Sequence, residues 1–174
     1  LRFRRRVFPR IRRVVCYDSD VSRVSAFTAK AQTCGGDFEV ISAQSCMEVL
    51  TCAPLVSFAT TAVQPYFSDL RSFGDGTTIL NISLRDFMPE AVLAADNIVD
   101  DVDHVCRANT SLHLPEQSLG NRQSIRASLA DILSGQVPAR AAGKPTIFSP
   151  FGMGILDLIV AEFIYGRAKE LNIN

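Results

Sequence analysis

Short apolar segments alternate with helical patterns along this 174-residue chain, and this alternation limits the possible folds more than any other feature. We expect strands over residues 14–17, 38–41, 55–59, 78–82, 97–99 and 145–148. We expect helices over residues 21–33, 46–52, 89–95, 102–112, 124–133 and 155–165. Such alternation is typical of an α/β domain with a largely parallel sheet and helices on both faces.

The stretch over residues 145–168 combines a strand, a turn that contains glycine and a helix that is apolar almost all round. A helix with apolar residues on every side is expected to be buried. Its charged residues Asp157, Glu162 and Arg167 make it unsuited to cross a bilayer. Glycines in the turn, Gly152 among them, would let a ligand approach the backbone. A tight turn without a ligand is an equally good interpretation of this spacing.

The formal net charge is zero, but seven of the 18 Lys and Arg residues lie within the first 13 positions. Phe3, Val7 and Ile11 recur among these arginines at the four-residue interval of one helix face. Pro9 would end this helix near Phe8. We therefore interpret the arginines as a solvated helix face, and we expect no nucleic-acid partner.

Five cysteines without a C-x-x-C pair favour the reduced thiols of a cytoplasmic protein over disulfides or a zinc site. We predict no signal peptide and no association with a membrane. The acidic group at residues 100–104 suits the positive end of a helix dipole. On a helix over residues 102–112 and beyond, His104 and His113 would face opposite ways. We therefore expect no metal site.

Polar residues follow the ends of the first and third predicted strands. Asp18 follows the first, and an acid at a strand end accepts hydrogen bonds from the adenosine ribose in dinucleotide-binding sheets. Thr60 and Thr61 follow the third, where small residues line the ligand crevice of an open α/β sheet. A solvated carboxylate and a helix N-cap are the respective alternatives.

Ser83, Arg85 and Asp86 follow the next strand and are expected at the same edge of the sheet. Arg85 is a candidate clamp for a substrate carboxylate, and Asp86 is a candidate general base. Ser83 is a candidate cofactor contact. A surface Arg–Asp pair of little energetic effect is the alternative.

Six segments, in their order along the chain, resemble the ornithine cyclodeaminase/μ-crystallin family: VVCYDSD, FATTAVQP, ILNISLRDFMPE, NIVDDVDHVCRANTSLHL, ADILSGQVPAR and IFSPFGMGILDLIVAEFIYGRA. The similarity is greatest to the branch that makes diaminopropionate for siderophores or antibiotics. That branch oxidises N-(amino-carboxyethyl)-glutamate with NAD and releases diaminopropionate and 2-oxoglutarate. The resemblance implies a Rossmann-like NAD-dependent oxidoreductase; the alternatives are an ornithine cyclodeaminase and a non-catalytic, crystallin-like NAD(P)-binding relative.

The resemblance also implies roles for individual residues. Asp18 resembles the acid that binds ribose, which implies NAD rather than NADP. Thr60 and Thr61 resemble the residues beside the nicotinamide ribose. Ser149 and Gly152 resemble the turn near the nicotinamide amide.

The position of the catalytic Asp in the cyclodeaminases falls on Leu84 in this chain, and Asp86 lies two positions later. This departure disfavours ornithine cyclisation. It leaves Asp86 and Arg85 as the candidates for catalysis.

Members of the family are considerably longer and carry an outer domain that binds substrate and forms dimers. The resemblance implies that residues 1–174 are the NAD-binding domain, without its first strand, its Gly-rich loop and the outer domain. We expect the full-length protein to be a homodimer that binds a small amino-acid substrate. We expect the 174-residue chain by itself to be poorly stable and inactive.

Overall fold

The computed structural model describes residues 7–33, 38–74 and 76–173 of the chain. The chain divides into two compact units, Leu1–Pro54 and Leu55–Asn174, and each is considered by itself. Most of the predicted arginine-rich helix lies outside the described residues, as do Cys34 and the two glycines that follow it.

In the residues that the structure describes, the first unit has a pair of parallel strands and the helices α2 and α3. It contains, in order, β1 (Arg13–Cys16), α2 (Val21–Gln32), β2 (Glu39–Ser42) and α3 (Cys46–Cys52). Asp20 caps α2 by accepting a hydrogen bond from the Ser22 amide, and Ser45 caps α3 through the Glu48 amide. Side-chain caps of this kind satisfy amides that the first helical turn leaves unpaired. The two helices therefore begin where the sequence predicts.

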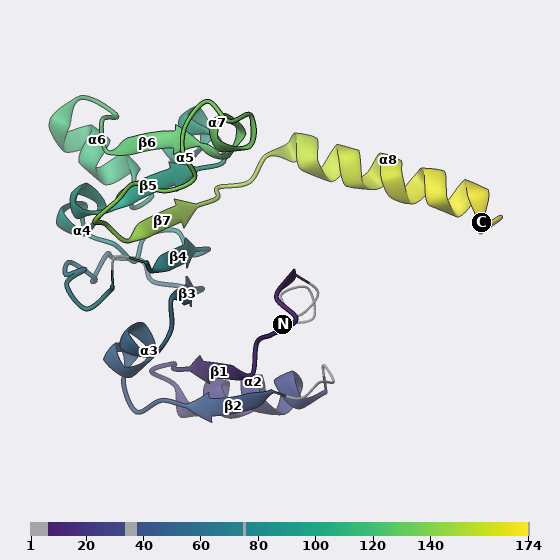
Figure 1. Cartoon of the computed structure of the whole chain (residues 1–174), viewed down its shortest axis with the longest axis horizontal. Helices are drawn as coiled ribbons and strands as arrows, with labels where there is room; N and C mark the ends of the chain where they lie inside the picture. Colours follow the sequence, from purple (N-terminus) through teal and green to yellow (C-terminus); the bar gives the residue numbers. More distant parts are fainter. Residues whose placement is uncertain (1–6, 34–37, 75, 174) are drawn as a thin grey trace. The chain divides into compact units, whose positions relative to one another are not determined.

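The second unit is a five-stranded sheet with its helices. It contains, in order, β3 (Leu55–Phe58), β4 (Thr78–Asn81), α4 (Pro89–Ala94), β5 (Asp96–Val99), α5 (Val102–Val105), α6 (His113–Leu119), β6 (Ile125–Ser128), α7 (Leu129–Leu133), β7 (Thr146–Ser149) and α8 (Gly154–Glu170). The strand order is β3-β4-β7-β5-β6, and every neighbouring pair is parallel. Figure 1 shows α4 to α7 beside this sheet. All five carboxyl ends consequently lie at one edge.

The predicted α/β fold with a largely parallel sheet is confirmed, but the strands form two sheets rather than one. Strands β1 and β2 pair with each other, and the other five strands form a separate sheet. In a doubly wound fold the first strand lies at the centre and would join two such groups. That a first strand is missing from these residues stays a prediction.

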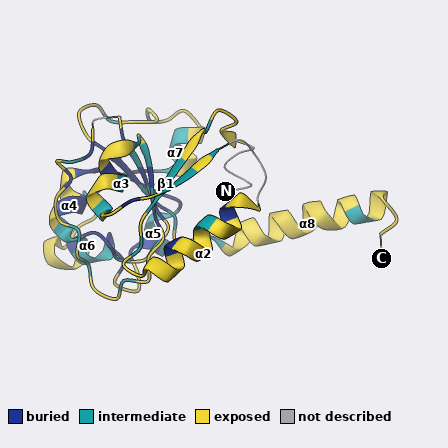
Figure 2. Cartoon of the chain, turned by 90° about the horizontal axis from the view of Figure 1, so that it is seen from below, coloured by how far each residue is buried: buried dark blue, intermediate teal, exposed yellow. Residues whose placement is uncertain are grey.

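Aromatic and aliphatic side chains fill the centre of the second unit, where Figure 2 colours residues of the strands as buried. Ile79 on β4 and Ile147 on β7 are 0 and 1% exposed. The ring of Phe87, after β4, lies 4.8 Å from that of Phe58 and 5.8 Å from that of Phe67, measured between centroids. Such tilted aromatic pairs add to the stabilisation that burial gives. The loops that follow β3 and β4 are thereby fixed to the core.

The prediction of one helix over residues 102–112 was wrong. Helix α5 ends at Val105, and Ala108 and Asn109 then adopt a left-handed backbone with φ of 53°. The Asn109 amide donates to Nδ1 of His113 at 3.2 Å, which supports this unfavourable conformation. Because α6 is a separate helix, the predicted opposition of the two histidines on one helix does not apply.

The prediction of one helix over residues 124–133 was wrong in its first half. Residues Ile125–Ser128 form β6, which pairs with β5 and completes one side of the sheet. Ser128 then begins α7 with a capping box that involves Asp131. Pairing with a neighbouring strand decided the conformation here, and no local sequence pattern reports such pairing.

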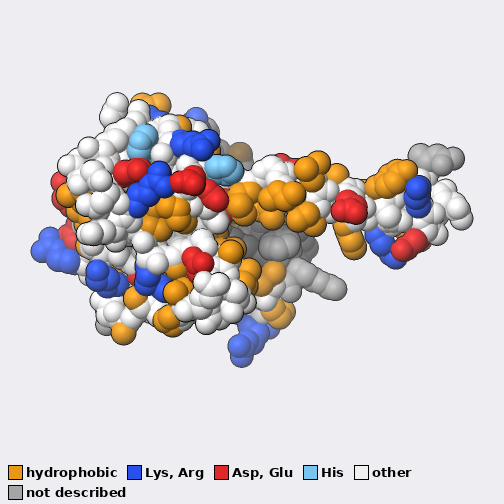
Figure 3. Space-filling view, turned by 90° about the horizontal axis from the view of Figure 1, so that it is seen from above, with side chains coloured by type: hydrophobic (Ala, Val, Ile, Leu, Met, Phe, Trp, Pro, Cys, Tyr) orange, Lys and Arg blue, Asp and Glu red, His pale blue; other side chains and the backbone are white. Residues whose placement is uncertain are grey.

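Helix α8 is apolar almost all round, as predicted, but it is exposed rather than buried. Leu158, Phe163 and Ile164 are 67, 68 and 59% exposed. Figure 2 shows exposed residues along nearly all of α8, and Figure 3 shows hydrophobic side chains along it. The sequence pattern predicted a helix with an apolar surface, and no other part of the described chain packs over that surface. Among those residues, no helix combines the length and apolar character that a bilayer crossing requires.

In the 174-residue chain by itself, we expect charged substitutions on α8 to reduce association without altering stability, because exposed apolar patches promote association. The double variant Leu158→Glu, Phe163→Lys should bind less of an apolar fluorescent dye and scatter less light. Its free energy of unfolding in urea should change by no more than about 0.5 kcal/mol. The buried control Ile147→Ala should lose about 2–5 kcal/mol. A loss in the α8 variant as large as in this control would show that α8 is packed in solution.

Candidate functional site

A row of hydrogen bonds joins the carboxyl ends of three neighbouring strands. The Asn81 side chain at the end of β4 donates to Oγ of Ser149 at the end of β7, at 3.1 Å. The single proton of the Ser83 hydroxyl is shared between Oδ1 of Asn81, which lies 3.2 Å from the hydroxyl oxygen, and the carboxylate of Asp86. The other oxygen of that carboxylate accepts from the Thr60 hydroxyl, just after β3. Thr60, Ser83, Asp86 and Ser149, which were predicted from three separate segments of the sequence, are therefore brought together.

Asp86 is the centre of this row. It is 0% exposed, and each carboxylate oxygen accepts a hydrogen bond from a different hydroxyl. Its backbone carbonyl accepts from the amides of Tyr66 and Phe67 at 3.0 and 2.9 Å. The residue therefore ties the loop after β3 to the loop after β4. Its role as general base stays a prediction, and this geometry favours a positioning role.

Arg85 braces the same loops through backbone carbonyls. Its Nη1 donates to the carbonyl of Val63 at 3.3 Å, and its Nη2 donates to that of Ala108 at 2.8 Å. Ala108 belongs to the left-handed turn after α5. The guanidinium thus joins the loops that follow β3, β4 and α5. Its role as a clamp for a substrate carboxylate stays a prediction.

Two further predicted residues, Thr61 and Asp18, are not members of this row. Thr61 is exposed. Asp18 belongs to the first unit, where its Oδ1 accepts a hydrogen bond from the Asp20 amide at 2.9 Å. This bond fixes the carboxylate just beyond the carboxyl end of β1. The roles of both residues in binding a cofactor stay predictions.

The turn after β7 contains the predicted residues Ser149 and Gly152. Gly152 has φ of 102°, which L-residues with a side chain rarely adopt. Its amide donates to Oδ2 of Asp100 at 2.6 Å, and the Phe151 amide donates to Oδ1 at 3.1 Å. The sequence reasoning missed Asp100 because it assigned all the neighbouring acids to a helix dipole. The position of Asp100 at the end of a strand, like that of Asp18, was the available signal.

A small cavity of about 130 Å³ opens at this edge, between the ends of β4 and β7 and the loop before α6. Asn81, Ser83, Thr110, Ser149 and Phe151 are among its lining residues. The volume is well below the roughly 300 Å³ of sites for drug-sized ligands, so it suits one ring or amide rather than a whole dinucleotide.

The chemistry of the lining fits the carboxamide of a nicotinamide. Ser149 is 5% exposed, and its oxygen accepts from Asn81. No residue in the described part of the chain is an acceptor for the Ser149 hydroxyl proton, so this proton is available to a ligand carbonyl. The residues present at this edge therefore fit one end of a nicotinamide nucleotide.

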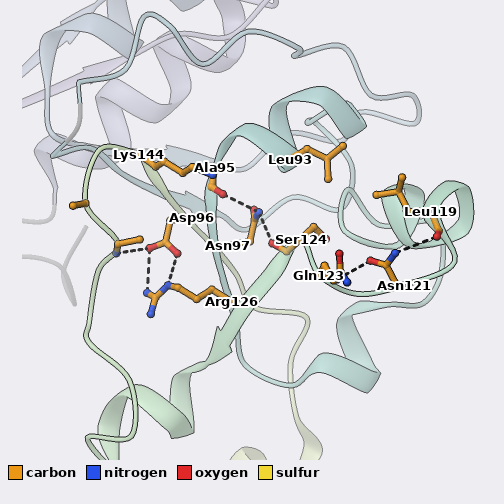
Figure 4. A pocket seen from close by; sticks show the side chains of 12 residues that line it. Leu93, Ala95, Asp96, Asn97, Leu119, Asn121, Gln123, Ser124, Arg126 and Lys144 are labelled. Atoms are coloured by element: carbon orange, nitrogen blue, oxygen red, sulfur yellow. Dashed lines mark hydrogen bonds and ion pairs between the residues drawn. The ribbon is translucent and has the colours of Figure 1, made fainter.

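A larger cavity, of about 320 Å³, lies at the opposite edge of the sheet (Figure 4). Asp96 at the start of β5 is 3% exposed and pairs with Arg126 of β6, whose Nη2 lies 3.1 Å from Oδ2. The Ala141 amide and the Thr146 hydroxyl also donate to Asp96, at 3.1 and 3.2 Å. This ion pair connects β5, β6, β7 and the loop before β7. We interpret it as structural, because ligands of open α/β sheets bind at the carboxyl edge.

The predicted acidic group at residues 100–104 does not form a metal cluster. Asp101 caps α5 by accepting from the His104 amide at 2.8 Å, and Asp103 pairs with Arg122. Within the described ranges, no group of three or more His, Cys, Asp or Glu side chains is arranged to hold a metal ion.

A parallel sheet with a row of polar groups along its carboxyl edge places the chain among the open α/β proteins, which bind ligands at this edge. Residues 2–172 match the ornithine cyclodeaminase/mu-crystallin family, and the chain belongs to that family. The resemblance seen in the six sequence segments is thereby confirmed.

One curated relative is the N-((2S)-2-amino-2-carboxyethyl)-L-glutamate dehydrogenase of Staphylococcus aureus, which is 28% identical over 95% of this chain and 50% of its own length. The Thermococcus litoralis Delta(1)-pyrroline-2-carboxylate reductase, solved with NADH and L-proline, superposes with a TM-score of 0.82 at 23% identity, over 94% of this chain and 52% of the other. An archaeal alanine dehydrogenase dimer with bound NAD gives a TM-score of 0.75 at 21% identity, over 98% and 53%. The chain thus spans about half the length of these relatives.

We expect Asp86→Ala to lower the free energy of unfolding by about 2–4 kcal/mol, because it leaves a cavity and two hydroxyls without their acceptor. Urea unfolding followed by circular dichroism measures this change. The control is Asp69→Ala, which removes an exposed aspartate paired with Arg71 and should cost far less. Equal losses in the two variants would contradict the central position of Asp86.

The Asp96–Arg126 pair should make stability depend on acid pH. Burial raises the pKa of Asp96, but hydrogen bonds from Arg126, Ala141 and Thr146 outweigh it and hold the pKa below its ordinary value of 3.8. Since the folded pKa is below the unfolded one, the stabilisation is complete above the unfolded pKa and is lost as the pH falls through the folded pKa. Asp96→Asn and Arg126→Gln should each flatten the fall in unfolding free energy below about pH 4. An unchanged slope in both variants would contradict this assignment.

Proposed function

We propose that this protein is an NAD-dependent oxidoreductase that acts on an amino-acid-derived secondary amine. The observation that carries the proposal is the row from Thr60 through Asp86, Ser83 and Asn81 to Ser149, which prepares the carboxyl edge of the sheet before any ligand binds. Preorganised polar groups at this edge are how open α/β sheets hold nucleotide cofactors.

Several residues of the chain would bind different parts of the cofactor. Ser149 and Gly152 would face the carboxamide, Thr60 and Thr61 the ribose beside it, and Asp18 the adenosine ribose. The bound NAD would accept a hydride from the Cα of the substrate. Asp86 would keep the Thr60 and Ser83 hydroxyls in place, and Ser149 would fix the orientation of the ring. Orientation of this kind is the main contribution that a protein makes to cofactor chemistry.

The substrate that we propose is N-(amino-carboxyethyl)-glutamate, cleaved after oxidation by water to 2,3-diaminopropionate and 2-oxoglutarate. The support is the similarity to the staphylococcal dehydrogenase over 95% of this chain. Leu84, 40% exposed, stands where the cyclodeaminases carry their catalytic Asp, which argues against ornithine cyclisation. A non-catalytic NAD(P)-binding relative is the second candidate, and turnover separates the two.

We also propose that the protein acts as a homodimer together with an outer domain. Two observations support this: the chain spans half the length of its relatives, and α8 exposes an apolar surface on all sides. The archaeal alanine dehydrogenase with bound NAD is a dimer. The cytoplasm, where NAD and reduced cysteines occur, is the proposed compartment.

Titration of the protein expressed from its complete reading frame with NAD⁺ and NADP⁺ tests the cofactor. We expect NAD⁺ to bind more tightly, because the Asp18 carboxylate would repel a 2′-phosphate. Asp18→Ala should shift the ratio of the two dissociation constants towards NADP⁺ by about tenfold, which corresponds to about 1.4 kcal/mol. Asp20→Asn, which removes a charge two residues away and keeps the helix cap, should leave the ratio unchanged.

Absence of NAD⁺ binding by the wild-type protein would contradict the proposal as a whole. NAD⁺ binding without formation of NADH from N-(amino-carboxyethyl)-glutamate would contradict the proposed substrate and favour the non-catalytic relative.

A further inference from the structure

The turn between β7 and α8 is held by a carboxylate from another strand. Asp100 directly follows β5, which lies beside β7 in the sheet with Val99 in register with Ser149. Its Oδ1 accepts from the Phe151 amide at 3.1 Å, and its Oδ2 accepts from the Gly152 amide at 2.6 Å. Asp100 is 8% exposed, so these bonds form largely out of contact with water.

These bonds matter because the two amides belong to neither a strand nor a helix. Successive amides that point to one side form a concave anion-binding site, and Asp100 supplies the anion from within the chain. A third bond, from the Asp101 amide at 2.8 Å, holds the Asp100 carboxylate in place. Gly152 completes the turn with a backbone conformation that needs glycine. These bonds hold the turn in the observed conformation without any ligand.

We propose that Asp100 is a positioning residue for the nicotinamide half of NAD and acts through the turn that contains Ser149 and Gly152. The inference rests on the proposed function, which puts the carboxamide at this turn. Asp100 need not touch the cofactor, because both of its oxygens are occupied by backbone amides. Its loss lets the turn move, while the groups assigned to the adenosine half remain unchanged.

The variant Asp100→Asn separates these effects with little change in size. An amide nitrogen donates but does not accept, so one of the two turn amides loses its acceptor. Asp101→Asn is the matched control, since it removes the same charge from the adjacent residue. Asp101 caps α5 through the His104 amide, and asparagine caps a helix as well as aspartate does.

Calorimetric titration of the full-length protein with NAD⁺ and with ADP-ribose, which lacks the nicotinamide, reads out the two halves of the site. Asp100→Asn should weaken NAD⁺ binding by about tenfold and ADP-ribose binding by less than about twofold. Asp101→Asn should leave both affinities at the wild-type value. Wild-type affinity for NAD⁺ in Asp100→Asn, or an equal loss for both ligands, would overturn the inference while leaving the proposed function intact.

Amide hydrogen exchange without NAD tests the same residue independently of cofactor binding. In the wild-type protein the amides of Phe151, which is 41% exposed, and of Gly152 should exchange slowly because Asp100 accepts from both. In Asp100→Asn at least one of the two should exchange about tenfold faster. Rapid exchange of both in the wild type would overturn the inference. Slow exchange in a protein that does not bind NAD⁺ would show that the proposed function, not the geometry of the turn, had failed.

Discussion

The buried carboxylate of Asp86 is the interaction on which the carboxyl edge of the sheet depends. A carboxylate with no exposure to solvent is costly unless hydrogen bonds compensate for the lost water. Thr60 and Ser83 supply those bonds, and this requirement fixes where the loops after β3 and β4 can lie. Asn81 then extends the row to Ser149 on the next strand. The physical need to satisfy one buried charge therefore shapes the surface that we assign to the cofactor.

We assign a structural role to the amino-terminal edge of the sheet and a binding role to its carboxyl edge. At the amino-terminal edge, Asp96 and Arg126 form an ion pair, and Asp96 also accepts from the Ala141 amide and the Thr146 hydroxyl. At the carboxyl edge, Ser149 keeps a hydroxyl proton that no described residue accepts. A group that is held in place but not fully satisfied is what a ligand can use. Asn97, which lines the cavity at the amino-terminal edge, also has a buried side-chain oxygen without a partner among the described residues. We therefore assign the binding edge from its position at the carboxyl ends of the parallel strands, where open α/β sheets bind their ligands.

Much of the fold could be predicted because its signals are local. The caps Asp20 and Ser45 and the apolar runs of β3, β4 and β7 located most elements within a few residues. What failed depends on distant contacts. Residues Ile125–Ser128 form a strand because they pair with β5. The segment after α5 forms a left-handed turn, in which the Asn109 amide donates a hydrogen bond to His113. Whether α8 is buried depends on contacts with other parts of a protein. The sequence of α8 shows only that its surface is largely apolar.

In the candidate site, too, features with local sequence signals could be predicted, and contacts between distant residues could not. The positions of Thr60, Ser83 and Ser149 could be predicted, since residues that follow parallel strands share one edge. The position of Asp100 at a strand end was a usable signal, but its partners Phe151 and Gly152 could not be predicted, because they lie about fifty residues further along the chain. The roles of Asp86 and Arg85 were predicted from residue type, whereas their contacts with hydroxyls and backbone carbonyls are set by the loops around them.

The most direct measurement is a crystal structure of the complete protein with NAD bound. We predict the nicotinamide at the carboxyl edge of the five-stranded sheet, with its carboxamide in hydrogen-bond contact with Ser149 and its ribose beside Thr60. A nucleotide bound at the opposite edge, in the cavity beside Asp96 and Arg126, would contradict the account. So would a nicotinamide that leaves Ser149 without contact.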